Sequence, residues 1–429
     1  MSDVLVIIGA AILFFALIMA SIALHEVGHL VPAKIFGVKV TKYFVGFGKT
    51  LWATRRGETE YGFKAIPLGG YVRLVGMYPP QGARTGKEGP VTRLADAARE
   101  VEYEEITPAD DGRLFHQKKT WQKLIIMFGG PAMNILLAFL IIGSVNALHG
   151  QYRPQLTIAA VSECIVPAAR AEQTCQPGDP QTPAAKMGLK AGDTIVSFNG
   201  TPISNWTNFS DLIRDNRDQP ATVVVLREGA QVTLPTVNTV ITGVPDRLNP
   251  SRTIEAGFMG VSPDYARERT GPVGTTQDIW LMTKQSVVGL ANFPVKVWNV
   301  AADMVTGKPR DVNGPMSIVG ASRTAGEIVA EDSIPANDRA ASWFMMLGSV
   351  NLFVALLNLV PLMPLDGGHM AGAIWEGIRR WFAKLRGRPD PGHVDTAKML
   401  PVAYAVGAFL VSSGAVLIIA DVVSPIKLF

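Results

Sequence analysis

Residues 4–29 read VLVIIGAAILFFALIMASIALHEVGH, an apolar block that runs directly into a His-Glu-x-x-His motif. A transmembrane helix needs roughly 20 mostly apolar residues, because the hydrocarbon layer of a bilayer is about 30 Å thick. Val4–Leu24 reaches this length without a charged residue, and it lacks the basic start and the small-residue cleavage site of a signal peptide. The stretch therefore predicts a membrane-spanning helix that carries the motif at its end.

Three further apolar blocks follow, at 124–148, about 344–365 and about 401–420. Of the 429 residues 48% are hydrophobic and only 18% are charged, which excludes a disordered chain. Two cysteines exclude a disulfide-rich scaffold and a cysteine-built zinc module, and a net charge of +4 is too small to indicate nucleic-acid binding. We therefore expect a polytopic α-helical membrane protein with four transmembrane helices.

Basic residues indicate how these helices are oriented. They gather after the first block, from Lys34 to Lys64, and after the third block, from Arg379 to Arg388. With four crossings both segments lie on one side, and the positive-inside rule makes that side cytoplasmic. We expect a protein of the cell membrane with both termini and the segment 150–343 outside the cytoplasm.

The polar segments differ in character. Residues 38–75 mix aromatic residues, β-branched residues and glycines, which is typical of strands. Residues 82–112 are charged and poor in aromatics, and we expect them to form a flexible connection. Residues 275–305 suggest an amphipathic helix broken near Pro294, either lying along the outer membrane surface or packed on the spanning helices.

The outer segment contains a small-domain pattern at 183–200: a short helix ending at Gly188, a Gly-Asp turn, and a strand ending in an Asn199-Gly200 turn. It resembles the segment shared by PDZ domains, with 222–226 as a later strand, and predicts one such domain over about Gln155–Pro245. Cys164 and Cys175 precede this pattern, and their spacing leaves a disulfide open.

His25-Glu26-Val27-Gly28-His29 predicts a metal site. Residues four apart share a helix face, so both imidazoles can bind one zinc ion with Glu26 beside it. The alternative is a pair of buried histidines with a structural glutamate, but ionisable residues within a membrane are costly and usually functional. A catalytic zinc needs a third protein ligand. Asp366, at the end of the third block, lies at the same depth and side, and His369 is a competing candidate.

These residues resemble the site-2 protease family of intramembrane zinc metalloproteases. The resemblance rests on His25–His29 and on the pattern from Asn358 to Gly367, and it covers most of the chain. Two shorter segments, 130–134 and 314–318, also resemble motifs of this family. Within the family the chain looks most like bacterial proteases that cut membrane-anchored anti-sigma factors, except that several of these carry two PDZ domains.

The resemblance implies a function and a set of site residues. It implies zinc ligation by His25, His29 and Asp366, and catalysis by Glu26. It also implies cleavage of single-span membrane substrates such as anti-sigma factors, after another protease has cut them first. The resemblance further implies a cytoplasmic membrane-reentrant β-loop that holds substrate in extended form. Expected substrate contacts are Asn134, Asn358, Gly69 and Gly70, although both asparagines could instead bond neighbouring helices.

The expected organisation follows the chain from end to end. The segments are a first transmembrane helix (1–30), a cytoplasmic segment with the β-loop (31–120), a second transmembrane helix (121–149), the PDZ domain with its flanks (150–270), an amphipathic segment (271–343), a third transmembrane helix (344–369), a basic loop (370–400) and a fourth transmembrane helix (401–421). Two other functions are alternatives: a catalytically silent PDZ scaffold of the same fold, and a zinc transporter. Glu26 and Asp366 argue against the scaffold, and clustering of the ionisable residues at one depth argues against the transporter. Whether the PDZ domain binds C-termini or excludes bulky substrates stays open.

Overall fold

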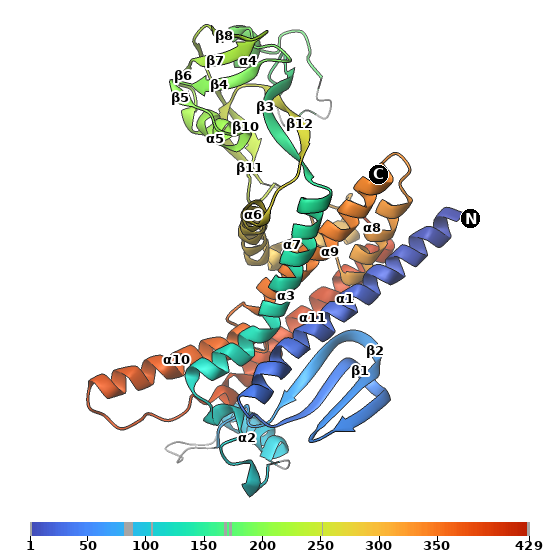
Figure 1. The fold of residues 1–429 in the computed structure, drawn as a ribbon, viewed down its shortest axis with the longest axis vertical. Coiled ribbons are helices and arrows are strands. Elements are labelled where there is room, and N and C mark those ends of the chain that lie inside the picture. Colours follow the sequence, from blue (N-terminus) through green and yellow to red (C-terminus); the bar gives the residue numbers. More distant parts are fainter. Residues whose placement is uncertain are drawn as a thin grey trace. The chain divides into compact units, whose positions relative to one another are not determined.

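The apolar blocks of the sequence form long helices in the computed structural model of the protein (Figure 1). The structure describes residues 2–80, 89–103, 106–166, 170, 174–250 and 252–426. It divides the chain into a helical unit, formed by Met1–Ser144 and Pro272–Phe429, and a β-rich unit, Val145–Gly271.

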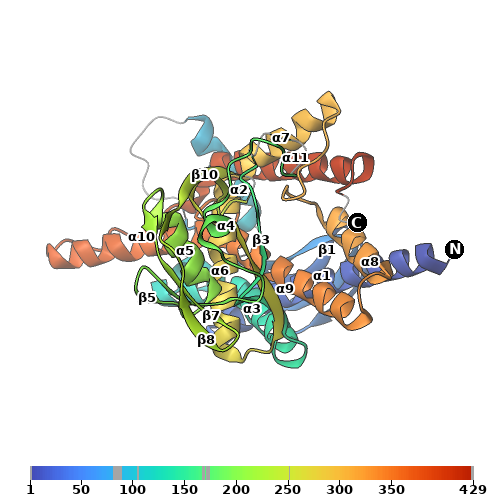
Figure 2. The same ribbon diagram turned by 90° about the horizontal axis from the view of Figure 1, so that it is seen from above.

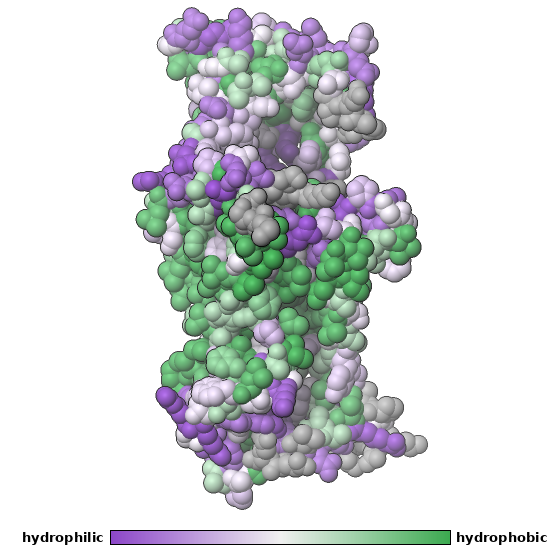
Figure 3. Space-filling view, turned by 90° about the vertical axis from the view of Figure 1, so that its right-hand side faces the viewer, coloured by the Kyte–Doolittle hydropathy of each residue, from purple (hydrophilic) through white to green (hydrophobic). Residues whose placement is uncertain are grey.

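Among the described residues, four helices are long and apolar enough to cross a membrane, which confirms the four predicted blocks. These helices are α1 (Ser2–Ile35), α3 (Thr120–Leu148), α9 (Ala336–Asn358) and α11 (Leu400–Val423). α1 continues past the predicted end of its block, because Leu30 and Ala33 in its last turns are buried in one cluster with Ile126 and Met127 of α3. Hydrophobic residues form a broad area on one face of the helical unit (Figure 3). The chain is a polytopic helical membrane protein.

The third predicted helix is wrong in its last part. α9 ends at Asn358, residues 359–365 form turns, and a new helix, α10 (Asp366–Leu385), begins at Asp366. Pro361 and Pro364 explain the break, since proline lacks a backbone N–H and restricts the residue before it. The expected basic loop over 370–400 is likewise wrong, because α10 occupies its first half.

The predicted strands of the first polar segment are confirmed. β1 (Val40–Arg56) and β2 (Thr59–Leu74) form an antiparallel hairpin that pairs Val40 with Leu74 at one end and Arg56 with Thr59 at the other. The end near α1 is anchored, because Val40 and Leu74 are buried with Leu30 of α1. Leu51, Trp52 and Phe63, by contrast, are exposed.

The expected flexible connection at 82–112 is wrong where the structure describes it, while 81–88 and 104–105 lie outside the described residues. α2 (Pro90–Tyr103) and a short turn at Pro108–Asp110 occupy this segment. Arg99 anchors α2, since its buried guanidinium donates to Asp96 at 2.7 Å and to the carbonyl of Pro79 at 3.2 Å, and also binds Asp395. An ordinary loop would leave such a charge in water.

Three shorter helices complete the helical unit. The predicted amphipathic helix is present as α6 (Pro272–Ala291) and α7 (Phe293–Thr306), with the break near Pro294. Val297 and Val300 of α7 pack on Leu417 and Ala420 of α11. Of the two predicted arrangements, α7 therefore adopts the one packed on the spanning helices. α8 (Ile318–Ala330) was not anticipated, and its Ala325 packs against α1.

The β-rich unit is built around a six-stranded sheet with the path β12-β3-β4-β7-β8 (Figure 1). The strands on this path are β3 (Gln151–Val161), β4 (Thr194–Phe198), β7 (Val223–Arg227), β8 (Ala230–Thr233) and β12 (Val261–Glu268), with β5 (Thr201–Pro202) paired to β4. The unit also contains α4 (Pro183–Met187), α5 (Trp206–Asn216), the pair β6 (Pro220–Ala221) and β9 (Val237–Asn238), and the pair β10 (Val240–Pro245) and β11 (Thr253–Phe258). The helix end at Gly188 and the turn at Asn199-Gly200 are as predicted, all three residues having positive φ.

The β-rich unit continues past Pro245, the expected end of the PDZ domain, up to Gly271. β12 pairs antiparallel with β3 from Val261↔Val161 to Glu268↔Gln151, so the last strand of the unit is a partner of its first. Turn patterns are local and can be recognised in a sequence, whereas this pairing joins residues at least 100 positions apart.

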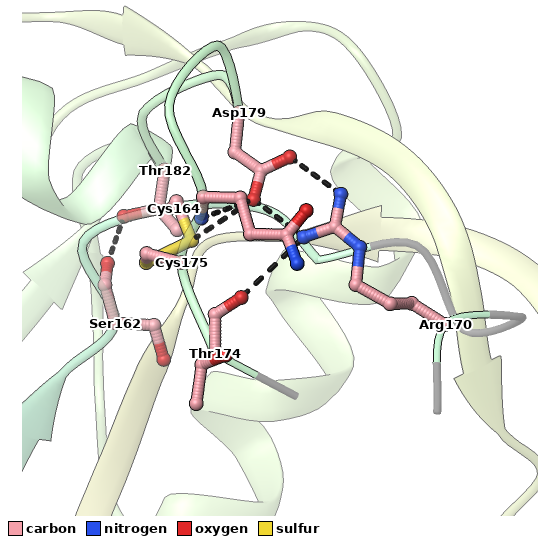
Figure 4. The surroundings of a disulfide bond; sticks show 8 residues. Ser162, Cys164, Arg170, Thr174, Cys175, Asp179 and Thr182 are labelled. Atoms are coloured by element: carbon pink, nitrogen blue, oxygen red, sulfur yellow. Dashed lines mark hydrogen bonds and ion pairs between the residues drawn. A yellow bond between two sulfur atoms is a disulfide. The ribbon is translucent and has the colours of Figure 1, made fainter. Parts of the chain in front are cut away.

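A disulfide joins Cys164 and Cys175, which the spacing had left open (Figure 4). Beside it, Arg170 donates to both carboxylate oxygens of Asp179 at 2.6 and 2.8 Å. The backbone N–H of Gln176 also donates to Asp179 at 2.8 Å. These contacts hold together the part of the β3–α4 connection that the structure describes.

Candidate metal and active site

The two histidines of the motif lie on one face of α1 and are buried. Their Nε2 atoms are 3.2 Å apart. Nδ1 of His29 lies 2.8 Å from the carbonyl oxygen of Ile126 in α3, so this nitrogen is the donor. The hydrogen bond leaves the lone pair of Nε2 directed toward His25, as in histidines that bind a metal.

Asp366 completes a cluster with these imidazoles. Its Oδ2 lies 3.4 Å from Nε2 of His25 and 3.3 Å from Nε2 of His29. Oδ2 is buried without a hydrogen-bond partner among the described residues, which is costly unless another group satisfies it. His25, His29 and Asp366 each offer one ligand atom, and these three atoms lie within 4.8 Å of one another, so they could hold one metal ion.

The spacing fits a tetrahedral zinc site. Ligand atoms about 2.0–2.2 Å from zinc in a tetrahedron are roughly 3.4 Å from one another. The three observed separations, 3.2, 3.3 and 3.4 Å, agree with that geometry. Two imidazoles and one carboxylate are also a ligand set that zinc accepts, and they leave one position open.

His369 does not join this cluster, although it lines the adjoining cavity. It lies one turn further along α10 than Asp366. The geometry therefore favours Asp366 over its competitor.

Glu26 lies beside the cluster and faces β2. A Cβ atom placed on Gly70 would be only 3.0 Å from Cγ of Glu26, so this strand passes directly over the glutamate. The backbone of Val72 in the same strand also interacts electrostatically with the carboxylate. Glu26 is thus held between α1 and β2, next to the histidines without being part of their cluster.

Glycines allow the two helices around the site to meet. A Cβ on Gly28 would lie 2.2 Å from the carbonyl oxygen of Gly129, and one on Gly129 would lie 2.0 Å from that of Gly28. A Cβ on Gly130 would lie 2.2 Å from Nε2 of His29. Gly130 was noted in the sequence only through family resemblance, and the structure gives its physical reason: α3 must approach the imidazoles closely.

A cavity of about 660 Å³ adjoins the cluster. Its lining includes His25, Glu26, His29 and Asp366. Three of the expected substrate contacts, Gly69, Gly70 and Asn358, line it as well. Asn134 is elsewhere: it is buried in α3, its Oδ1 has no partner among the described residues, and it does not line the cavity.

One wall of this cavity, which α2 forms, is not among the features predicted from the sequence. Ala98 and Glu102 line it, together with Met77 and Tyr78 after β2. Burial raises the pKa of Glu102, although the N–H groups of Met77 and Tyr78 donate to its carboxylate at 2.5 and 3.1 Å. The available signal was the spacing of Ala95, Ala98, Arg99 and Glu102, which repeats at helical intervals.

Comparison with known proteins identifies similar chains. A model of peptidase family M50 matches residues 13–389. Zinc metalloprotease Rip1 of Mycobacterium tuberculosis is 33% identical over 441 residues, which cover 97% of this chain and 98% of the relative. Rip1 of Mycolicibacterium smegmatis is 32% identical over 98% of this chain and 99% of the relative, and metalloprotease MmpA of Caulobacter vibrioides is 25% identical over 84% of each.

Proposed function

Because the chain belongs to peptidase family M50 and is a zinc metalloprotease, we propose that His25, His29 and Asp366 hold its zinc ion and that Glu26 is its catalytic base. The observation that carries this assignment is the separation of the three ligand atoms by 3.2–3.4 Å, with Glu26 beside them. The buried Oδ2 of Asp366 also supports it, since this atom has no hydrogen-bond partner among the described residues.

The residues around the site have separable roles. Zinc, when bound, polarises the scissile carbonyl and lowers the pKa of water toward about 7. Glu26 accepts a proton from the attacking water and returns it to the leaving amine. The carbonyl of Ile126 keeps Nδ1 of His29 protonated, so that Nε2 stays available as a ligand.

The proposed substrates are single-span membrane proteins such as anti-sigma factors, cut in or near their transmembrane segment after a first cleavage. A helical substrate hides its peptide bonds in its own hydrogen bonds and must be extended before it is cut. The cavity supports this, because the β2 residues Gly69 and Gly70 line it beside Glu26 and Asn358. An extended segment added along β2 would present its backbone to these residues.

We further propose how the protein lies in the membrane. The basic residues favour a multi-pass protein of the cell membrane with both termini outside the cytoplasm and the active site near the cytoplasmic side. The exposed Leu51, Trp52 and Phe63 favour a hairpin that re-enters the bilayer. The β-rich unit is proposed to be one extracytoplasmic PDZ domain, on the helix–turn–strand order from α4 to β4.

Glu26→Gln tests the proposed chemistry. Glutamine keeps the size of the side chain but cannot accept a proton, so turnover of a single-span substrate should fall by roughly 10²–10⁴-fold. Zinc content should stay at the wild-type level, because Glu26 is not a ligand. Turnover near the wild-type rate would exclude Glu26 as the base. Loss of zinc would place it among the ligands.

A further inference from the structure

α10 presents an apolar face that its own protein leaves uncovered. At 3.6 residues per turn its large exposed side chains fall on one side of the helix, which we call the outer face. The outer face consists of Ile374, Trp375, Ile378, Trp381, Phe382 and Leu385. Trp375 and Trp381 are 56% and 57% exposed, so these indoles are not packed into the bundle. Figures 1 and 2 both show α10 extending outward from the helical unit.

The opposite side of α10 is packed against helix ends. Glu376, which is buried, accepts hydrogen bonds from Lys123 at 2.9 and 3.0 Å. A Cβ on Gly377 would lie 3.1 Å from Thr120, and one on Gly372 would lie 3.3 Å from Thr396. Thr120 and Thr396 are the first residues of two candidate membrane spans, and α10 itself follows the end of a third. α10 therefore lies at the level where the spans meet the bilayer surface.

Positive charge borders the outer face. Arg379 and Arg386 lie along one edge of it and Lys384 along the other, with Arg388 just beyond the helix. The acidic groups of α10 are directed elsewhere, because Glu376 is paired on the inner side and Asp366 belongs to the metal cluster. Lys384, Arg386 and Arg388 are exposed.

We propose that α10 is an interfacial helix that binds anionic phospholipid, with its outer face in the acyl-chain boundary and its basic residues on the phosphates. Tryptophan favours this depth, since its ring is apolar and its N–H needs a polar partner. Arginine and lysine hold anionic headgroups while their stems stay along the apolar surface. A protein partner would have no need of basic residues along both edges of an aromatic face, whereas a lipid surface matches both features.

Fluorescence quenching tests which molecules contact the outer face. The full-length protein is placed in nanodiscs that contain bromine-labelled phosphatidylglycerol or bromine-labelled phosphatidylcholine. The chain has 8 tryptophans, so the signal of α10 is isolated by subtracting a Trp375→Phe/Trp381→Phe variant. We expect the labelled phosphatidylglycerol to quench this signal more strongly. No quenching by either lipid would overturn the proposal, because a protein surface would then cover the face, and equal quenching would overturn the preference for anionic lipid.

Charge removal tests the basic border. Each basic residue near an anionic surface adds about fivefold to the affinity, so Lys384→Gln/Arg386→Gln/Arg388→Gln should weaken the preference for phosphatidylglycerol by roughly 100-fold. The matched control, Lys186→Gln/Arg252→Gln/Lys308→Gln, removes the same charge from exposed positions outside α10 and should keep the preference. An equal loss in both variants would reduce the effect to net charge and overturn the proposed site.

Discussion

The orientation and packing of the His25 and His29 rings depend on α3 as well as on α1, the helix that carries them. The carbonyl of Ile126 orients the His29 ring, and Gly130 leaves space for its Nε2. Hydrogen-bond partners of metal ligands set the tautomer and the direction of the lone pair. The proposed metal site therefore depends on the close approach of α3 to α1, which the glycines of these helices allow.

Gly130→Ala should lower zinc affinity roughly 10- to 100-fold, as changes around metal ligands commonly do. The added Cβ would lie 2.2 Å from Nε2 of His29 and 2.7 Å from Nε2 of His25, which forces the rings or the helices apart. Zinc retained during dialysis against a chelator measures the effect. Gly143→Ala in the same helix is the control, since its Cβ would meet nothing closer than 3.6 Å. Equal retention in the two variants would contradict the proposed role of Gly130.

Asp366→Ala should lose most of the bound zinc together with its activity, because two imidazoles alone make an incomplete site. His369→Ala, one turn away on the same helix, should keep its zinc, since His369 is not part of the cluster. Elemental analysis of the purified variants distinguishes them. The reverse outcome would move the third ligand to His369.

At the scale of elements, predictions from local composition were wrong where other features fix the structure. Low aromatic content at 82–112 suggested a flexible connection, yet α2 is held by Arg99 and by the Glu102 carboxylate. In the third block, apolar character continued to Leu365 while Pro361 and Pro364 had already ended the helix. The two prolines already indicate the break in the sequence, but the apolar character of the block favoured a longer helix.

The Cys164–Cys175 disulfide should stabilise the β-rich unit. It closes a loop with a sequence separation of 11, for which the chain-entropy model gives about 3 kcal/mol. Cys164→Ser/Cys175→Ser should therefore lower the unfolding free energy of this unit by about that amount, measured by thermal unfolding of the full chain. Reductant should destabilise the wild type to the same extent and leave the variant unchanged. A variant as stable as the wild type would mean that Arg170 and Asp179 suffice to hold the loop.

At the scale of the whole molecule, the β-rich unit is an insertion that the chain enters and leaves at neighbouring points. The N–H of Thr270 donates to the carbonyl of Asn146 at 3.1 Å, and β3 pairs with β12 just beyond. Residues between these points can therefore be replaced by a short linker with little strain on α3 and α6. Among the residues that the structure describes, none from this unit lines the cavity beside the proposed metal site.

We propose that the β-rich unit acts as a substrate filter that restrains cleavage of untrimmed substrates. Replacing residues 147–269 with a short Gly-Ser linker should remove this filter and spare the chemistry. We expect the shortened protein to cut a single-span substrate already trimmed outside the membrane at about the wild-type rate. It should also cut the untrimmed form, which we expect the wild type to spare. The measurement is side-by-side cleavage of the two forms, with Glu26→Gln in the shortened protein as the inactive control. Continued protection of the long form would place the filter elsewhere, with α6 and α7 as the next candidates.

The sequence by itself determined the four candidate membrane-spanning helices, the hairpin strands and the His-Glu-x-x-His motif, because each depends on composition or spacing within one segment. The depth of Asp366, level with the two histidines, could also be predicted, since membrane topology places the ends of the helices. Only the tertiary structure showed that Asp366, rather than His369, lies with the two imidazoles. It alone also showed the disulfide, the α2 wall of the cavity and the pairing of β12 with β3. These features join segments far apart in the chain, and no local pattern records which distant residues will meet.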